Sequence, residues 1–296
     1  MVTTYLITNN GKWRYGSTAV EFPKKTITMI QLDTIYNEDC VEGMKQIEEG
    51  SVDCVVTSPP YDNLRKYGGT AESWNFDKFK IVAQQIVRVL KKGGVCVWVV
   101  SDGVVNGSES GTSFRQALFF MECGLLLYDT MIYLKANPIP QTQRRYEQTF
   151  EYMFVLSKGK PVTFNPIKVK CIRAGKPQQW GRSINTDERT VKYLRADDVQ
   201  ITRETKIHGN IFTYSVGGNK TGHPAVFPER LALDQIYSWS NTNELILDPF
   251  IGSGTTAIAC IKEHRHFVGF ELNKKYFDIA QRRINLERQQ LSLDLP

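Results

Sequence analysis

The sequence has no long apolar segment, no closely spaced cysteine pair and no secretory leader pattern. No apolar run reaches the ~20 residues that a membrane-spanning helix requires, and residues 1–10 lack the basic-then-apolar pattern of a signal peptide. The six cysteines are scattered without Cys-x-x-Cys spacing, which favours reduced structural thiols over a zinc site or a disulfide framework. We therefore expect a cytoplasmic protein with no membrane anchor and no bound metal.

The length and composition allow a large folded domain with a hydrophobic core. The 296 residues suffice for one large α/β domain with an insertion, and 41% hydrophobic residues suffice for a core. The net charge of +6 permits nucleic-acid binding without proving it.

A short apolar run at residues 52–56 is followed by Thr57-Ser58-Pro59-Pro60-Tyr61. The β-branched run predicts a buried strand of a parallel sheet, which the prolines end abruptly. Ligands bind beyond the carboxyl ends of such strands, so Ser58 and Tyr61 are expected in a stiff loop at the ligand edge. Oxygen acceptors beside an aromatic ring suit a flat molecule with an –NH2 group. These residues alone also fit an ordinary turn with a surface tyrosine.

A second stretch, residues 244–256, predicts a strand, a glycine turn and a helix. Gly252 and Gly254 would let the backbone approach a ligand at the helix N-terminus. No Lys follows the second glycine, so this is not a P-loop. Glu271 ends a short apolar strand about 20 residues later, the spacing at which an acid binds ribose hydroxyls. A dinucleotide-binding unit and a capped helix with an exposed Glu are the alternatives.

Taken together, Ser58-Pro59-Pro60-Tyr61 and residues 248–256 resemble the motifs of amino-methylating DNA methyltransferases that use S-adenosylmethionine. The catalytic motif precedes the cofactor motif, as in the circularly permuted β class. Residues 35–40 and 223–230 resemble further cofactor motifs of the family. The resemblance covers about 33–160 and 220–288. It implies a Rossmann-like α/β methyltransferase fold, with a mixed, mostly parallel, seven-stranded sheet and an inserted target-recognition region.

The resemblance also implies a role for each motif residue. The catalytic loop would be Ser58, Pro59, Pro60 and Tyr61, with Tyr61 stacked on a flipped base. The S-adenosylmethionine site would contain Asp39, Cys40, Asp248, Phe250, Gly252, Gly254, Thr255 and Glu271. Among these, Glu271 would hold the ribose hydroxyls, while Asp39 and Cys40 would border the adenine.

Ser at the first catalytic position is typical of the cytosine N4 branch of the family, whereas Asp is typical of adenine N6. We therefore expect cytosine N4 methylation, with adenine N6 as the alternative. A methyltransferase for an RNA base or a protein amide is a rival, although such families usually carry Asn at this position. The rival from another class is a catalytically idle, cofactor-binding partner for DNA recognition. It is disfavoured because every expected catalytic residue is present.

Residues 160–220 contain twelve Lys or Arg and five Asp or Glu, a net charge of +7 that exceeds the charge of the whole chain. In β-class relatives the target-recognition region lies between these motifs. Basic side chains there would track phosphates, while Gln178, Gln179 and Asn185 could read base edges. The predicted DNA contacts are Arg65, Lys66, Arg144, Arg145, Arg173 and Arg182. A solvated insertion and plain surface charge are the alternatives.

We expect four regions along the chain. They are an N-terminal extension at 1–32, a catalytic half at 33–160, the target-recognition insertion at 161–220 and a cofactor-binding half at 221–296. The extension could be an added hairpin, a dimer contact or a DNA-facing arm. Double-stranded DNA is the expected substrate. A cognate restriction endonuclease and a homodimer are further partners that the resemblance allows.

Overall fold

The computed structural model describes residues 13–15, 18–20, 30–60, 74–138, 140, 144–179, 199–215 and 228–293. The chain divides into two compact units, residues 1–30 and 31–296. In the first unit, strands β1 (Trp13–Tyr15) and β2 (Thr18–Val20) pair antiparallel as a small hairpin, one of the arrangements considered for the extension. The second unit contains the main sheet and every predicted site residue.

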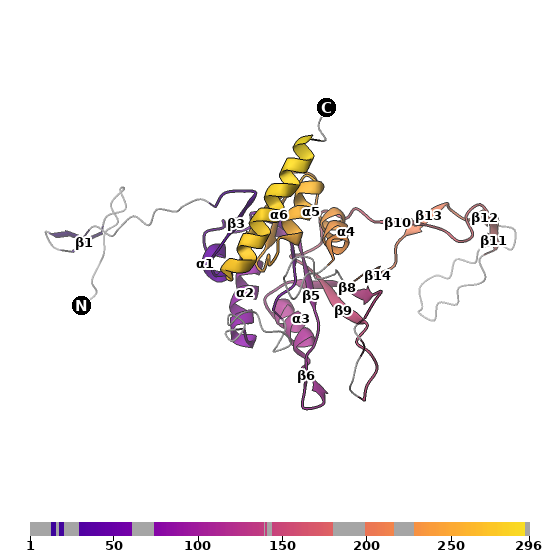
Figure 1. The fold of residues 1–296 in the computed structure, drawn as a ribbon, viewed down its shortest axis with the longest axis horizontal. Helices are drawn as coiled ribbons and strands as arrows, with labels where there is room; N and C mark the ends of the chain where they lie inside the picture. The colour runs from indigo at the N-terminus through magenta and orange to yellow at the C-terminus, as the bar shows by residue number, and fades with distance from the viewer. Residues whose placement is uncertain are drawn as a thin grey trace. The chain divides into compact units, whose positions relative to one another are not determined.

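An eight-stranded sheet organises the second unit (Figure 1). In spatial order its strands are β14 (Ile211–Tyr214), β8 (Leu126–Lys135), β9 (Phe150–Ser157), β5 (Leu90–Val100), β4 (Val52–Thr57), β15 (Leu245–Asp248), β16 (His266–Phe270) and β3 (Thr34–Tyr36). Strand β9 runs antiparallel to β8 and β5, and every other neighbouring pair in this sheet is parallel. The carboxyl ends of all its strands except β9 therefore lie at one edge, which we call the carboxyl edge.

The mixed, mostly parallel sheet is confirmed, but it has eight strands rather than the predicted seven. The additional strand is β14, which comes from the end of the segment assigned to the target-recognition insertion. Its residues alternate, with Phe212 and Tyr214 buried, and it pairs parallel with β8 from Ile132 to Lys135. Strand β8 would otherwise expose a row of unpaired backbone groups there, which explains why this short segment joins the sheet.

Helices cover both faces of the sheet (Figure 1). Trp98 in β5 contacts Phe79 and Phe120 of the first helical layer, with ring centroids 5.7 and 5.2 Å away. The adjacent Val97 faces the other way and packs in a core cluster with Ile236 of the second layer. The first layer contains α1 (Cys40–Met44), α2 (Phe76–Val89) and α3 (Thr112–Glu122), and the second contains α4 (Glu229–Trp239), α5 (Thr255–Lys262) and α6 (Lys274–Leu293). Among the described residues, no helix is long and apolar enough to cross a membrane.

The junction between α2 and β5 differs from the prediction. The sequence pattern predicts a helix from Phe79 to Leu90, ended by the glycines of residues 91–94, and a strand from Val95 to Val100. Instead α2 ends at Val89 and β5 begins at Leu90. A Cβ at Gly94 would lie 2.8 Å from the carbonyl oxygen of Asp53 in β4. Glycine therefore permits a close approach of two strands here, rather than a helix stop.

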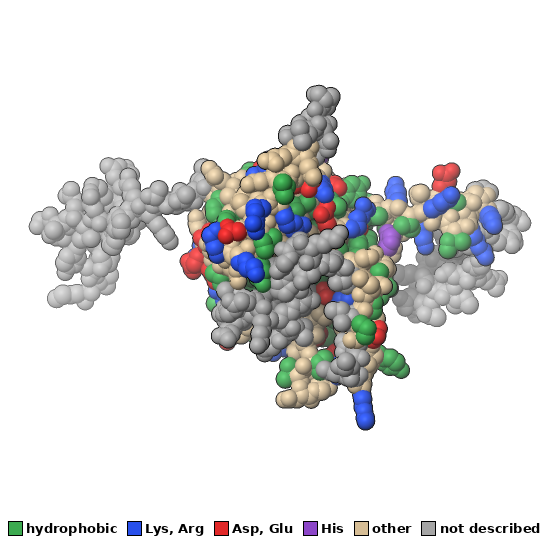
Figure 2. Space-filling model, viewed as in Figure 1, with side chains coloured by type: hydrophobic (Ala, Val, Ile, Leu, Met, Phe, Trp, Pro, Cys, Tyr) green, Lys and Arg blue, Asp and Glu red, His purple; other side chains and the backbone are tan. Residues whose placement is uncertain are grey.

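The segment between β9 and β14 contains an antiparallel ribbon in two parts. Strand β10 (Lys168–Lys170) pairs with β13 (Thr205–Ile207), and β11 (Pro177–Gln179) pairs with β12 (Val199–Ile201). The side chains of β10 and β13 are exposed, apart from one half-buried residue, and Figure 2 shows Lys and Arg side chains in blue around them. Strands β10 to β13 thus form a ribbon outside the main sheet, within the basic stretch of the sequence, and we call these four strands and the described residues between them the basic ribbon.

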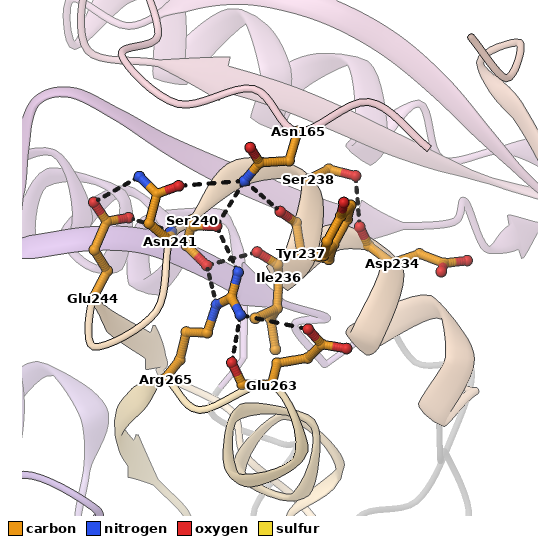
Figure 3. Close-up of polar contacts among 10 residues, drawn as sticks. All are labelled: Asn165, Asp234, Ile236, Tyr237, Ser238, Ser240, Asn241, Glu244, Glu263 and Arg265. Carbon is orange, nitrogen blue, oxygen red and sulfur yellow. Dashed lines mark hydrogen bonds and ion pairs between the residues drawn. The ribbon is translucent and has the colours of Figure 1, made fainter. Parts of the chain in front are cut away.

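Asn165, which precedes the basic ribbon, forms hydrogen bonds with the carboxyl end of α4 (Figure 3). Its Nδ2 donates hydrogen bonds to the carbonyl oxygens of Tyr237 at 3.0 Å and Ser240 at 3.1 Å. Arg265, with a side chain only 7% exposed, donates to the same Ser240 oxygen at 2.7 Å. The last carbonyls of a helix have no partners within the helix, so these side chains satisfy them. The start of the insertion is thereby tied to the helix that leads into β15.

Candidate active site

Four adjacent strands bring the predicted motif residues to the carboxyl edge. Ser58 follows β4, Asp248 ends β15, Glu271 follows β16 and Asp39 lies just after β3. Because β4, β15, β16 and β3 are neighbours and run parallel, their ends meet at the same edge. The catalytic and cofactor motifs, which are far apart in the sequence, are therefore neighbours in the fold.

Asp248 is the buried centre of this edge, with an exposed fraction of 1%. Its Oδ1 accepts hydrogen bonds from the Thr57 hydroxyl at 2.5 Å and the Phe250 N–H at 3.0 Å, while Oδ2 accepts from the Thr256 hydroxyl at 2.6 Å. Burial raises the pKa of Asp248 to about 6, even though these three hydrogen bonds act to lower it. Since Thr57 and Asp248 are 191 residues apart, their bond joins the catalytic strand directly to the cofactor strand.

Glu271 is held by the backbone on both sides of its carboxylate. Oε2 accepts from the N–H of Gly252 at 3.1 Å, and Oε1 accepts from the N–H of Asn273 at 2.7 Å. Burial raises the pKa of Glu271 above its ordinary value, and these backbone hydrogen bonds oppose the rise. Each carboxylate oxygen has two lone pairs, so the fixed carboxylate can still accept from hydroxyl donors of a ligand. Asn37, which the motif analysis did not single out, donates to the Glu271 carbonyl at 2.8 Å.

The predicted glycine turn is present between β15 and α5. Gly252 has φ 53° and Gly254 has φ 86°, in the left-handed region that favours glycine. Thr255 is buried and begins α5 directly after Gly254. Arg283 of α6 donates to the carbonyl and the hydroxyl of Ser253 at 2.5 and 3.0 Å, so a helix distant in the sequence fixes the turn.

Asp39 and Cys40 lie at the start of α1. Asp39 accepts from the N–H of Val41 at 2.8 Å and from Lys78 of α2 at 2.8 Å. Partial burial acts to raise the pKa of Asp39, but the hydrogen bonds from Lys78 and Val41 hold it below its ordinary value. Burial raises the pKa of the Cys40 thiol to about 12, so the thiol stays protonated. No sequence pattern indicated Lys78, because its partner Asp39 lies in another segment of the chain.

In the loop after β4, Pro59 is buried and Ser58 and Pro60 are half-buried. Tyr61 lies outside the described residues. Phe250 stands edge-to-face against Trp74, with ring centroids 5.1 Å apart. Trp74 therefore adds an aromatic ring beside the cofactor motif that no sequence pattern indicated.

The predicted DNA-contacting residues fall into different settings. Arg144 and Arg173 are exposed. Arg145 instead donates to the Gly107 carbonyl at 2.8 Å and lies 3.8 Å from the Glu109 carboxylate, in the hairpin of β6 (Val104–Val105) and β7 (Ser108–Glu109). Arg65, Lys66 and Arg182 lie outside the described residues, as does Asn185. In the structure, Arg145 therefore contacts the β6–β7 hairpin of its own chain.

The groups at the carboxyl edge fit a cationic nucleoside such as S-adenosylmethionine. Glu271 offers a fixed acceptor for ribose hydroxyls, and Phe250 offers an aromatic face. Asp248 and Glu271 place two carboxylates at the glycine turn, which favours a positive ligand charge where they are ionised. A phosphate would meet the same carboxylates as like charges, so the arrangement is less suited to a dinucleotide.

Known proteins match this chain over most of its length. Residues 52–282 match a family of N6 and N4 methyltransferases described as DNA methylase. The orphan methyltransferase M.BamHII of Bacillus amyloliquefaciens is 43% identical over 249 residues, covering 81% of this chain and 91% of that protein.

Solved structures share the fold. The crystal structure of the M1.HpyAVI–SAM complex is 25% identical with a TM-score of 0.53, and the match covers 84% of this chain and 98% of that chain. The PvuII DNA methyltransferase, described as cytosine-N4-specific, is 20% identical with a TM-score of 0.62, covering 88% of this chain and 89% of that chain. At 20% identity, the similarity to the PvuII enzyme shows a shared fold only.

Proposed function

Because the chain belongs to the DNA methylase family, which transfers the methyl group of S-adenosylmethionine to an exocyclic amino group in DNA, we propose that its target is N4 of cytosine. The predicted family, Rossmann-like fold, enzyme class and cofactor are confirmed. The observation that carries the choice of base is Ser58, placed directly after β4 at the carboxyl edge. Ser at this position is typical of the cytosine N4 branch, and adenine N6 is the alternative.

In the proposed mechanism, Ser58 and Pro59 act on the amino group of the base. This nitrogen is a poor nucleophile because its lone pair is delocalised into the ring. If the Ser58 hydroxyl and the Pro59 carbonyl accept its two N–H groups, a pyramidal nitrogen with a localised lone pair is favoured. The same oxygens stabilise the positive charge that develops on the nitrogen. The bond from Thr57 to Asp248 supports this loop by fixing the strand end that precedes it.

The proposed cofactor site surrounds the glycine turn. S-adenosylmethionine supplies an electrophilic methyl group on a sulfonium. We assign Glu271 to the ribose hydroxyls, Asp39 and Cys40 to the border of the adenine, and Phe250 to an apolar contact. Gly252, Gly254 and Thr255 complete the turn, while Asp248 holds it to β4. Most of the rate enhancement would then come from holding the two reactants in line, with little covalent chemistry by the protein.

We assign DNA recognition to the exposed basic ribbon and to Arg144, which lies between β8 and β9. Arg173 and Arg144 are exposed and suited to phosphates. Flipping a base out of the duplex costs a few kcal/mol, which stacking on Tyr61 and such basic contacts would offset. The boundaries at residues 32, 160 and 220 remain predictions, as do a cognate restriction endonuclease and a homodimer.

The experiment that tests the function is mass spectrometry of nucleosides from duplex DNA incubated with the purified protein and S-adenosylmethionine. We expect N4-methylcytosine. N6-methyladenine would overturn the choice of base but keep the rest of the proposal. DNA binding without any methylated base would instead support the idle-partner alternative.

The proposed role of the loop is tested with Ser58→Ala, which should lower the methylation rate on the order of 10²- to 10³-fold. Ser51→Ala is the matched control, because Ser51 lies at the opposite end of the same strand and its hydroxyl bonds to the Glu48 carbonyl at 2.7 Å. It should keep the normal rate. A Ser58→Ala protein that methylates as fast as the Ser51→Ala protein would rule out this role.

A further inference from the structure

Two short segments connect the basic ribbon to the rest of the second unit. Residues 163–167 precede β10 and residues 208–210 follow β13, and we call these two segments the neck. The N–H of His208 donates to the carbonyl oxygen of Ile167 at 2.8 Å, which joins the two segments. Pro166 also restricts the residue before it to extended conformations. The neck is therefore a closed, stiff connection, and its direction depends on its contacts with the rest of the chain.

The first neck segment is bound to the carboxyl end of α4 (Figure 3). The Nδ2 of Asn165 donates to the carbonyl oxygens of Tyr237 at 3.0 Å and Ser240 at 3.1 Å. Phe164 stacks on Trp239, with ring centroids 5.0 Å apart. These carbonyls have no partners inside the helix, so the Asn165 amide helps to satisfy them. Asn165 is therefore the polar anchor of the first segment.

The second neck segment is bound to β8, a different element. The Nδ2 of Asn210 donates to the carboxylate of Asp129 at 3.2 Å and lies 3.4 Å from the carbonyl oxygen of Thr130. The backbone carbonyl of Asn210 accepts from the N–H of Ile132 at 2.8 Å. A neck attached at one point could rotate about it, whereas attachment to both α4 and β8 removes that freedom. Asn165 and Asn210 together therefore fix the direction of the ribbon.

We propose that Asn165 and Asn210 are positioning residues for the methylation reaction, an inference that rests on the proposed function. Both anchors lie away from the carboxyl edge, since α4 ends before the start of β15 and Asn210 precedes the start of β14. Duplex DNA is stiff over about 150 base pairs, so a site held by the ribbon moves with the ribbon as one body. A rotation at the neck would displace the target base from Ser58, and the displacement grows with distance from the neck. A fixed neck therefore keeps the base within reach of the catalytic loop.

Neither asparagine supplies charge to DNA. The basic side chains of the ribbon remain when either asparagine is replaced, so the attraction for phosphates should also remain. The affected step is the alignment of the amino group with S-adenosylmethionine, where a misplacement of about 1 Å can cost about 10²-fold in rate. A residue that contacted DNA or the cofactor would instead change an affinity. Retained affinity with a slower reaction is therefore the result that indicates positioning.

The test compares the affinity of the full chain for unmethylated plasmid DNA, measured by filter binding, with the single-turnover rate of methyl transfer to the same DNA. Asn165→Ala should keep its affinities for DNA and S-adenosylmethionine within about twofold and lower the methylation rate roughly 10- to 100-fold. Asn285→Ala is the matched control, because Asn285 is exposed on α6 and accepts a hydrogen bond from Gln281 of the same helix at 3.2 Å. It should keep both the affinities and the rate, and circular dichroism should give both variants the unmodified spectrum.

An exchange of donor and acceptor tests the second anchor. Asn210→Asp places a second carboxylate beside Asp129 and should lower the methylation rate roughly three- to tenfold, with little change in DNA affinity. The double variant Asp129→Asn, Asn210→Asp restores one donor and one acceptor, so it should recover most of the lost rate. A double variant no faster than Asn210→Asp alone would overturn the second anchor.

Two results for the first anchor would contradict its positioning role. One is an unchanged methylation rate for Asn165→Ala, and the other is a loss of DNA affinity as large as the loss of rate. An unmodified protein that transfers no methyl group to DNA would contradict the proposed function, and with it this proposal, before any variant is compared.

Discussion

The cofactor turn and the basic ribbon differ in where their polar groups find partners. At the turn, Asp248 and Glu271 accept hydrogen bonds from within the chain on both carboxylate oxygens. On the ribbon, Arg173 and the side chains of β10 and β13 face solvent. The turn is therefore organised before any ligand binds, which reduces the entropy that binding must overcome. The ribbon therefore presents exposed basic charge to an external partner.

This difference predicts that substitutions at the turn affect stability and cofactor binding, whereas substitutions on the ribbon affect DNA binding alone. Asn165 connects the two regions, because it ties the start of the insertion to the helix that leads into β15. The following changes test the contrast, from the largest expected effect to the smallest.

Asp248→Ala should lower the free energy of unfolding by about 3–5 kcal/mol, measured by urea denaturation. The change leaves the hydroxyls of Thr57 and Thr256 and the N–H of Phe250 without their buried acceptor. Asp278→Ala on α6 is the control, because its ion pair with Lys274 is solvent-exposed and should contribute less than about 1 kcal/mol. Equal free energies of unfolding for Asp248→Ala and Asp278→Ala would mean that the hydrogen bonds of Asp248 do not stabilise the carboxyl edge.

The free energy of unfolding should also change with pH, because the Asp248 carboxyl titrates. Its pKa of about 6 in the folded protein lies above the ordinary 3.8, so its protonated form is favoured by folding. Protonation of Asp248 therefore contributes up to about 3 kcal/mol to the free energy of unfolding. This contribution is fully present below pH about 4 and is lost as the pH rises through about 6. Asp248→Asn removes this titration. The stability of the unmodified protein relative to that variant should therefore fall between these pH values and stay constant above them.

Glu271→Ala should weaken S-adenosylmethionine binding on the order of 10²-fold in calorimetry, because it removes the acceptor proposed for the ribose hydroxyls. Glu42→Ala is the control, since Glu42 is a surface residue of α1 with a side chain 63% exposed. It should bind the cofactor normally. Glu271→Ala binding as tightly as the control would refute the ribose assignment.

Arg173→Ala should weaken DNA binding about two- to fivefold and reduce the slope of log affinity against log salt by about 1, without changing cofactor affinity. Lys45→Ala is the control, because Lys45 already pairs with Glu42 on the surface of α1. Fluorescence anisotropy at several salt concentrations measures both. An unchanged salt slope for Arg173→Ala would mean that this residue does not contact a phosphate.

Much of the fold followed from local patterns. The strands predicted at 52–56 and within 244–256 match β4 and β15, because each is an apolar run with a clear end. Strand β14 and the start of β5 were not predicted, because short or glycine-containing strands depend on a neighbouring strand for their pairing. The true role of Gly94 appears only when Asp53 is placed beside it.

The sequence by itself determined which residues end the strands of the carboxyl edge, because motif order and apolar runs are local properties that parallel pairing carries to one edge. Only the tertiary structure decided how those residues are held. The bond from Thr57 to Asp248 spans 191 residues, Lys78 reaches Asp39 from another helix, and Arg145 is bound to a hairpin. Such contacts depend on distances in space between segments remote in the chain, which no local pattern encodes.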